Sequence, residues 1–187
     1  NNSAKSIGAF FSYNFSPNTT LTYTNLYGRE SVDNEALEQF RLCQNIYLNQ
    51  TFADKIIMTL GFDHGWQSNS DISDPEKAAT MYAGVVVLRY QFKPKTSVTA
   101  RYEIFHDPNG FRGGLNPIGP TEFAGYELDA YTLGCEYRPT KKSYLRAEIR
   151  QTVAQAELEM FFRNNQSRNT RFEFLVTMGV DIEKIFE

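Results

Sequence analysis

The chain has 187 residues, a formal net charge of -3 and a mean hydropathy of -0.46. No apolar run approaches the roughly 18 residues that a membrane-spanning helix needs, and Lys and Arg form no basic stripe, which argues against nucleic-acid binding. Aromatic residues nevertheless make up 14% of the chain. A chain this aromatic and this polar on average is typical of membrane strands with one apolar and one polar face. A soluble antiparallel sheet with one wet face is the alternative.

Apolar and polar residues alternate in nine segments of about ten residues, and this period of two predicts β-strands. The pattern is clearest at 171–182, where a row from Phe172 to Ile182 alternates with a more polar row from Arg171 to Asp181. One face of each predicted strand is therefore apolar, and the other is wet. The nine predicted strands are residues 5–15, 19–27, 39–48, 55–66, 80–92, 97–105, 126–138, 143–151 and 171–182.

Short and long connections alternate between these predicted strands. The short ones contain turn formers or helix breakers, such as Pro17, Pro94 and Pro139. Outer-membrane barrels have short periplasmic turns and long extracellular loops, so the sequence predicts an all-β fold: a transmembrane antiparallel up-and-down β-barrel, forming one domain over 1–187. The longest connection either folds inward as a constriction or lies over the mouth. The short connections are 16–18, 49–54, 93–96 and 139–142, and the long ones are 28–38, 67–79, 106–125 and 152–170.

The number of predicted strands is odd, and this affects how the barrel is completed. If the short turns are periplasmic, the first strand runs towards the periplasm and so does the ninth. Bacterial single-chain barrels usually have an even number of strands with both ends in the periplasm. We therefore hypothesise that the nine strands are the C-terminal part of a larger, even-stranded barrel, with at least one further strand before residue 1.

Charged residues recur at the centres of the predicted strands, on the polar face. An Arg facing lipid at the membrane midplane would cost roughly 2 to 4 kcal/mol, so these side chains are expected to face a lumen. There, Arg and Glu on adjacent strands can line an aqueous path and orient polar solutes. Alternatively, they form a salt-bridge network that plugs a narrow barrel. The candidate pore-lining residues are Arg41, Arg89, Arg101, Glu103, Glu136, Arg146, Glu148, Arg150, Arg171 and Glu173.

Aromatic residues also mark the loop-side ends of predicted strands, at Trp66, Tyr82 and Tyr126. Membrane barrels carry aromatic girdles at both membrane surfaces. We expect these three residues to belong to the girdle, whereas core aromatics of a soluble sheet are the alternative.

Catalytic and metal sites have weaker support. His64 and His106 each directly adjoin an Asp, but no Ser is marked as a nucleophile, and a triad is recognised by geometry rather than by spacing. Asp71, Asp74 and Glu76 could bind calcium, yet the spacing and the Gly of an EF-hand loop are absent, which favours a solvated acidic loop. We therefore expect no catalytic residue, no metal and no cofactor.

Two stretches carry a family resemblance. Residues 101–111 read RYEIFHDPNGF, and residues 137–150 read YRPTKKSYLRAEIR. They resemble the final third of OmpL-like β-barrel porins, in which an R-Y-E-x-F strand leads into a D-P-x-G-F loop and a Y-x-P-T turn leads into an L-R-x-E-x-R strand. The resemblance implies an outer-membrane porin of a Gram-negative bacterium, without a cofactor or catalytic residues. One departure is that Phe186 is penultimate, whereas porins commonly end on an aromatic residue.

The predicted function is passive diffusion of small polar or charged solutes through an outer-membrane porin lined by Arg and Glu. The alternative is a closed outer-membrane barrel that serves as a structural scaffold or adhesin subunit; a soluble β-sandwich or ligand-binding barrel is a third hypothesis. The expected partners are outer-membrane lipid, lipopolysaccharide and small polar solutes, with homo-oligomers or other outer-membrane proteins left open and nucleic acid excluded.

Overall fold

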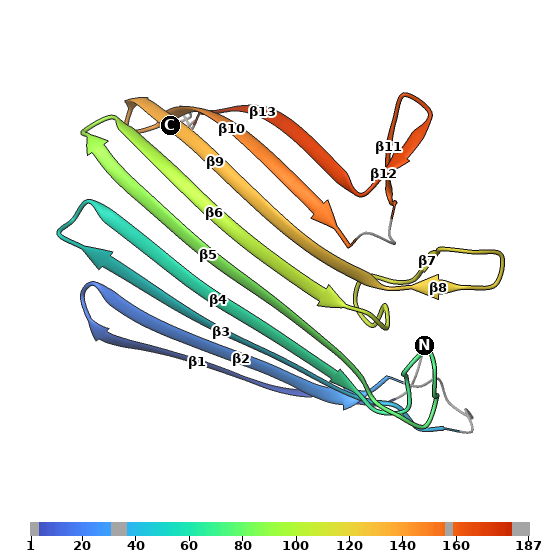
Figure 1. The fold of residues 1–187 in the computed structure, drawn as a ribbon. Coiled ribbons are helices and arrows are strands. Elements are labelled where there is room, and N and C mark those ends of the chain that lie inside the picture. Colours follow the sequence, from blue (N-terminus) through green and yellow to red (C-terminus); the bar gives the residue numbers. More distant parts are fainter. Residues whose placement is uncertain (1–3, 31–36, 156–158, 181–187) are drawn as a thin grey trace, which may run out of the picture.

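The computed structural model describes residues 4–30, 37–155 and 159–180. Over these residues the chain is all-β, and no helix in them is long and apolar enough to cross a membrane. Nine long strands form one sheet (Figure 1). They are β1 (Ile7–Ser16), β2 (Thr19–Arg29), β3 (Phe40–Phe52), β4 (Ile56–Gln67), β5 (Ala79–Lys93), β6 (Thr96–Asp107), β9 (Tyr126–Thr140), β10 (Ser143–Ala154) and β13 (Thr170–Val180).

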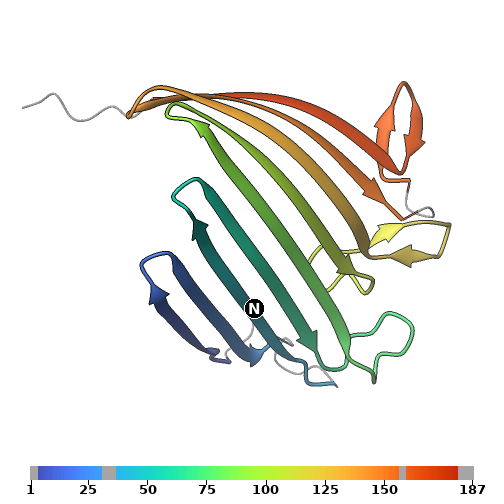
Figure 2. The ribbon, with the colours of Figure 1, turned by 60° about the vertical axis from the view of Figure 1, so that its left-hand side comes forward.

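Every long strand pairs antiparallel with the next long strand along the chain. The order is β1-β2-β3-β4-β5-β6-β9-β10-β13, so the sheet has the predicted up-and-down topology. The sheet curves strongly, and β1 and β13 lie at its opposite edges without pairing with each other (Figures 1 and 2). The predicted antiparallel up-and-down sheet is confirmed, and within the described residues it is open rather than closed into a barrel.

The strand boundaries agree with the predicted ranges to within three residues except at one turn. Residues 49–52, predicted to be part of a connection, continue β3, and the turn is confined to 53–55. The turn can be this short because Ala53 and Asp54 adopt positive φ angles of 47° and 55°, which form a tight hairpin. Two successive residues of positive φ match the right-handed twist of the paired strands and reverse the chain in little space. Asp181 and Ile182 of the last predicted strand lie outside the described residues.

Two of the long connections contain small hairpins that the alternation does not predict. Strands β7 (Asn116–Pro117) and β8 (Phe123–Ala124) pair between β6 and β9, while β11 (Phe161–Arg163) and β12 (Gln166–Arg168) pair between β10 and β13. Strands of two or three residues are too short for a period of two to be recognised. Both hairpins lie at the same end of the sheet, opposite the short turns (Figure 1).

The two faces of the sheet differ sharply in chemistry. Val86, Tyr102 and Tyr131 follow one another across β5, β6 and β9 on the outer face, and each side chain is at least 39% exposed. On the inner face of β9, by contrast, Ala130 and Thr132 are 4% and 5% exposed, because the sheet curves around this side. A continuous apolar outer face requires an apolar surrounding, since burying apolar area is worth roughly 25 cal/mol per Å².

Aromatic residues occupy both ends of the outer face, with one correction to the prediction. Trp66 and Tyr82 lie on the outer face near the loop-side ends of β4 and β5, as expected for a girdle. Tyr126 does not: it shares the inner face of β9, next to Gly113, and its hydroxyl donates to Asn116 Oδ1 at 3.1 Å. Outer-face aromatics near the turn-side ends are Tyr13, Phe52, Tyr90 and Tyr137.

A pair of identical substitutions tests the two-faced sheet. Leu133 lies at the centre of β9 on the outer face, and Leu175 at the centre of β13 on the inner face. Leu133→Arg should destabilise the protein in lipid vesicles by about 2 to 4 kcal/mol, because the charge would face hydrocarbon. Leu175→Arg should cost far less, since an inward charge meets water. Urea denaturation in vesicles measures both, and equal losses would contradict the assignment of faces.

Candidate functional site

The structure places all ten candidate pore-lining residues on the inner face. The register shows this strand by strand: Arg89 is opposite Thr99, which shares a face with Arg101 and Glu103, and Thr99 is in turn opposite Gly134 on β9. Because side chains alternate along each strand, one register links the face of every strand to its neighbours. The ten residues are Arg41 on β3, Arg89 on β5, Arg101 and Glu103 on β6, Glu136 on β9, Arg146, Glu148 and Arg150 on β10, and Arg171 and Glu173 on β13.

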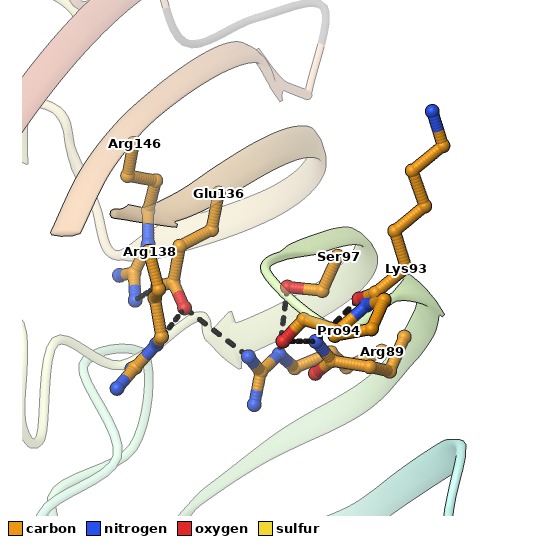
Figure 3. Close-up of polar contacts among 8 residues, drawn as sticks. Arg89, Lys93, Pro94, Ser97, Glu136, Arg138 and Arg146 are labelled. Carbon is orange, nitrogen blue, oxygen red and sulfur yellow. Dashed lines mark hydrogen bonds and ion pairs between the residues drawn. The ribbon is translucent and has the colours of Figure 1, made fainter. Parts of the chain in front are cut away.

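The first cluster on this face surrounds Glu136, near the short turns (Figure 3). Arg89 Nη2 lies 3.1 Å from Glu136 Oε1, Arg138 Nε donates to the same oxygen at 2.7 Å, and Arg146 donates to Oε2 through both Nε and Nη2. Ser97 supports the cluster from β6 by accepting from Arg89 Nε at 3.0 Å. The Glu136 side chain is 5% exposed, so three guanidinium groups cover one buried carboxylate.

A second cluster lies nearer the centre of the strands and joins β6 to β10. Glu103 Oε2 lies 3.1 Å from Arg101 Nε and 3.3 Å from Arg150 Nη2. Strand β9 runs between these residues, and Thr132 is opposite both Arg101 and Arg150. The long side chains can meet because the inner face of β9 offers only small residues at this level.

The other candidate residues are distributed around the two clusters. Glu148 lies beside Gly134, where an added Cβ would meet Glu148 Cγ at 3.2 Å, and so it sits between the clusters. Arg171 and Glu173 pair with each other on β13 at 2.7 Å. Arg41 lies apart, on β3, with Glu30 Oε2 3.4 Å from its Nη1. Seven of the ten candidate residues therefore lie in the two clusters or directly beside them.

The loop after β6 folds onto the inner face at the loop-side end. Asp107, which is fully buried, accepts hydrogen bonds from the backbone N–H groups of Phe111, Arg112 and Gly113 at 2.7 to 2.8 Å. This loop conformation aims the Phe111 ring at Gly65 of β4, where an added Cβ would lie 2.2 Å from the ring. Of the two conformations that the sequence allows for 106–125, the part around Phe111 adopts the inward one.

Phe111 also contacts Arg41, which lies apart from the two clusters. The guanidinium carbon of Arg41 stands 4.7 Å from the centre of the Phe111 ring, a cation–π contact. Arg41 Nε further donates to Gln67 Oε1 at 2.7 Å, and Gln67 is 7% exposed. A loop residue thus joins β3 and β4 across the inner face.

Sequence reasoning missed several residues of the inner face. Arg138 was not among the candidates, although it lies two residues after Glu136 and alternation places both on one face. Asp63 was considered only as a neighbour of His64; it accepts from Asn45 Nδ2 at 2.7 Å and from the Tyr47 hydroxyl at 3.3 Å. Phe111 ends the D-P-x-G-F motif, but its contact with Gly65 carries no local signal because the two residues are distant in sequence.

The histidines do not form the arrangement that a hydrolase needs. Adjacent residues of a strand point to opposite faces, so His64 and His106 lie on the outer face while their neighbours Asp63 and Asp107 lie on the inner one. His106 instead stacks on Tyr82 at 4.5 Å and lies 3.3 Å from Glu127.

The acidic loop between β4 and β5 binds its own backbone. Asp71 accepts hydrogen bonds from the backbone N–H and hydroxyl of Ser73 and from the N–H of Asp74. The Ser73 hydroxyl bond is the main reason why the pKa of Asp71 lies below its ordinary value. No group of three or more His, Cys, Asp or Glu side chains in the described part of the chain is arranged to hold a metal ion.

Comparison with known proteins identifies a family. The family model described as putative β-barrel porin-2, OmpL-like, matches residues 1–182, which is nearly the whole chain. No curated protein and no solved structure shows a significant match.

Removing the buried carboxylate tests the cluster around Glu136. Glu136→Gln should lower the free energy of unfolding by about 1 to 3 kcal/mol, because three guanidinium groups would lose a charged acceptor and repel one another. Glu148→Gln is the matched control, since it removes the same charge from the same face beside Gly134. Urea midpoints in detergent micelles compare the two, and equal midpoints would contradict the role of Glu136.

The contact between Phe111 and Gly65 is tested by adding one methyl group. Gly65→Ala should displace the Phe111 ring, because the new Cβ would lie 2.2 Å from it. Trypsin should then cleave after the exposed Arg112 several times faster than in the unmodified protein. Gly84→Ala is the control: its Cβ would meet the Ile104 side chain at 3.1 Å on the outer face. Unchanged cleavage in Gly65→Ala would show that Phe111 does not hold the loop.

Proposed function

The chain belongs to the OmpL-like β-barrel porin family, and from this membership we propose that it is an outer-membrane porin through which small polar or charged solutes diffuse passively. The observation that carries the proposal is the charged inner face: the ten predicted Arg and Glu residues and Arg138 share it, while the outer face is apolar. Charge inside and hydrocarbon outside is the pattern of a water-filled barrel.

The inner face also retains space beside its ion pairs, as a pore requires. A hollow of about 430 Å³ lies on this face, lined among others by Tyr47, Asp63, Arg101 and Arg150. The Arg101 and Arg150 side chains are each 33% exposed although both contact Glu103. The ion pairs therefore fix the side chains against the wall and leave their outer groups accessible to solutes.

We further propose that the open edges at β1 and β13 are completed by additional strand pairing. Unpaired backbone N–H and C=O groups inside a bilayer cost several kcal/mol each, so a membrane sheet has to close. In the larger, even-stranded barrel hypothesised above, the nine strands form part of the wall. Outer-membrane lipid and lipopolysaccharide then surround the apolar face. The part of the loop after β6 that lies around Phe111 narrows the entrance of the pore.

Planar-bilayer recordings test the porin function. The intact protein, purified in detergent, should produce discrete steps of ion conductance, because an aqueous lumen lets salt pass. The same preparation after heat unfolding serves as the control and should give none. A folded protein that inserts without conducting would contradict the proposal and favour the closed scaffold or adhesin.

A further inference from the structure

The cluster around Glu136 exposes its positive charges more than its negative one. Around Glu136 the Arg89, Arg138 and Arg146 side chains are 30%, 45% and 40% exposed, whereas the carboxylate is 5% exposed. Around Glu103, two guanidinium groups share one carboxylate, and the two arginines and Glu103 are equally exposed, at 32% to 33%. In both clusters, arginines outnumber the acids that they contact.

The second cluster contains two donors and one acceptor, Glu103 Oε2, that are buried without a hydrogen-bond partner among the described residues. Arg150 Nε is buried and has no hydrogen-bond partner among the described residues. Arg101 Nε lies 3.1 Å from Glu103 Oε2, but this contact lacks hydrogen-bond geometry. Guanidinium groups bind carboxylate and phosphate oxygens more strongly than neutral acceptors. Both arginines line the hollow of about 430 Å³, which has the size of a small-solute site.

Three further carboxylates face the clusters and oppose this charge. One is Glu173, which lies opposite Arg150 in the register of β10 and β13. Asp63 lines the same hollow from β4, where Asn45 and Tyr47 donate to it. Glu148 lies beside Gly134, between the clusters. The hollow thus has Asp63 at its β4 side and two arginines with one carboxylate, Glu103, at its β6 and β10 side. The guanidinium groups around Glu136 extend from there to the short turns.

We infer that the pore prefers anions, and that small solutes bearing a carboxylate or phosphate bind transiently at Arg101 and Arg150. The inference rests on the proposed porin function and names its class of substrate. Positive groups along a wall raise the local concentration of anions and lower that of cations. A shallow site open to the lumen releases the solute again, as passage requires.

Reversal potentials in a KCl gradient test the preference. The intact protein should pass chloride more readily than potassium at about 0.1 M salt, where the Debye length is about 10 Å. The preference should weaken at about 1 M, where that length falls to about 3 Å. Equal permeability or a preference for potassium at low salt would overturn the inference while leaving the porin function intact. Absence of any conductance step would instead overturn the porin function.

Substitution at the hollow tests the site itself. Arg150→Gln should lower the ratio of chloride to potassium permeability about threefold, because one cationic group near the ion path is lost. Glu103 keeps Arg101 as its partner in this variant. Lys77→Gln is the control: it removes the same charge from a loop side chain that is 73% exposed. An unchanged ratio in Arg150→Gln, or an equal fall in Lys77→Gln, would contradict the site.

A measurement without any substitution complements the variants. Succinate or inorganic phosphate, added at millimolar concentration, should reduce chloride current through the unmodified pore by occupying the two arginines. Equally concentrated glucose, which carries no charge, should reduce it much less. Equal reduction by all three solutes would show simple crowding of the lumen and overturn binding at the arginines.

Discussion

Strand register is the constraint on which the rest of the structure depends. In an antiparallel ladder, a shift of one residue moves every side chain of a strand to the other face. Here such a shift would turn Arg89 or Glu136 towards lipid and Leu88 or Cys135 towards the lumen. Each such shift would place a charged side chain in hydrocarbon, so a membrane environment strongly favours the observed register. The charged clusters then follow, because the same register sets which side chains are neighbours.

The clusters show how β9 serves as a spacer. Its inner face carries Ala130, Thr132 and Gly134 between strands that carry Arg and Glu. Small residues on the middle strand let side chains from β6 and β10 cross it and meet, as Glu103 and Arg150 do at 3.3 Å. A large residue there would separate them. Arginine suits this geometry because its planar, forked donors contact a carboxylate and still present N–H groups elsewhere.

The sequence predicts local features of this fold well and non-local ones poorly. The nine long strands and the inward position of all ten charged residues follow from alternation alone, since a period of two is visible within each segment. The grouping around Glu136 is not visible, because Arg89 lies 47 residues away and meets it only through the pairing of β6 with both neighbours. The inward fold of the Phe111 loop depends on Gly65, which offers no side chain to recognise. Tyr126 was assigned to the wrong face because only its position at a strand end was considered. Its place in the alternation of side chains along β9 puts it on the inner face.

The balance of charge on the inner face connects stability with function. A fully paired network would satisfy every guanidinium group and leave little for a solute to bind, as in a plugged barrel. A face without carboxylates would suffer repulsion among arginines that stand on adjacent strands. The observed arrangement lies between these limits: buried Glu136 holds three arginines in place, and Glu103 holds two. One carboxylate that anchors several arginines stabilises the wall and leaves part of each guanidinium group facing the water.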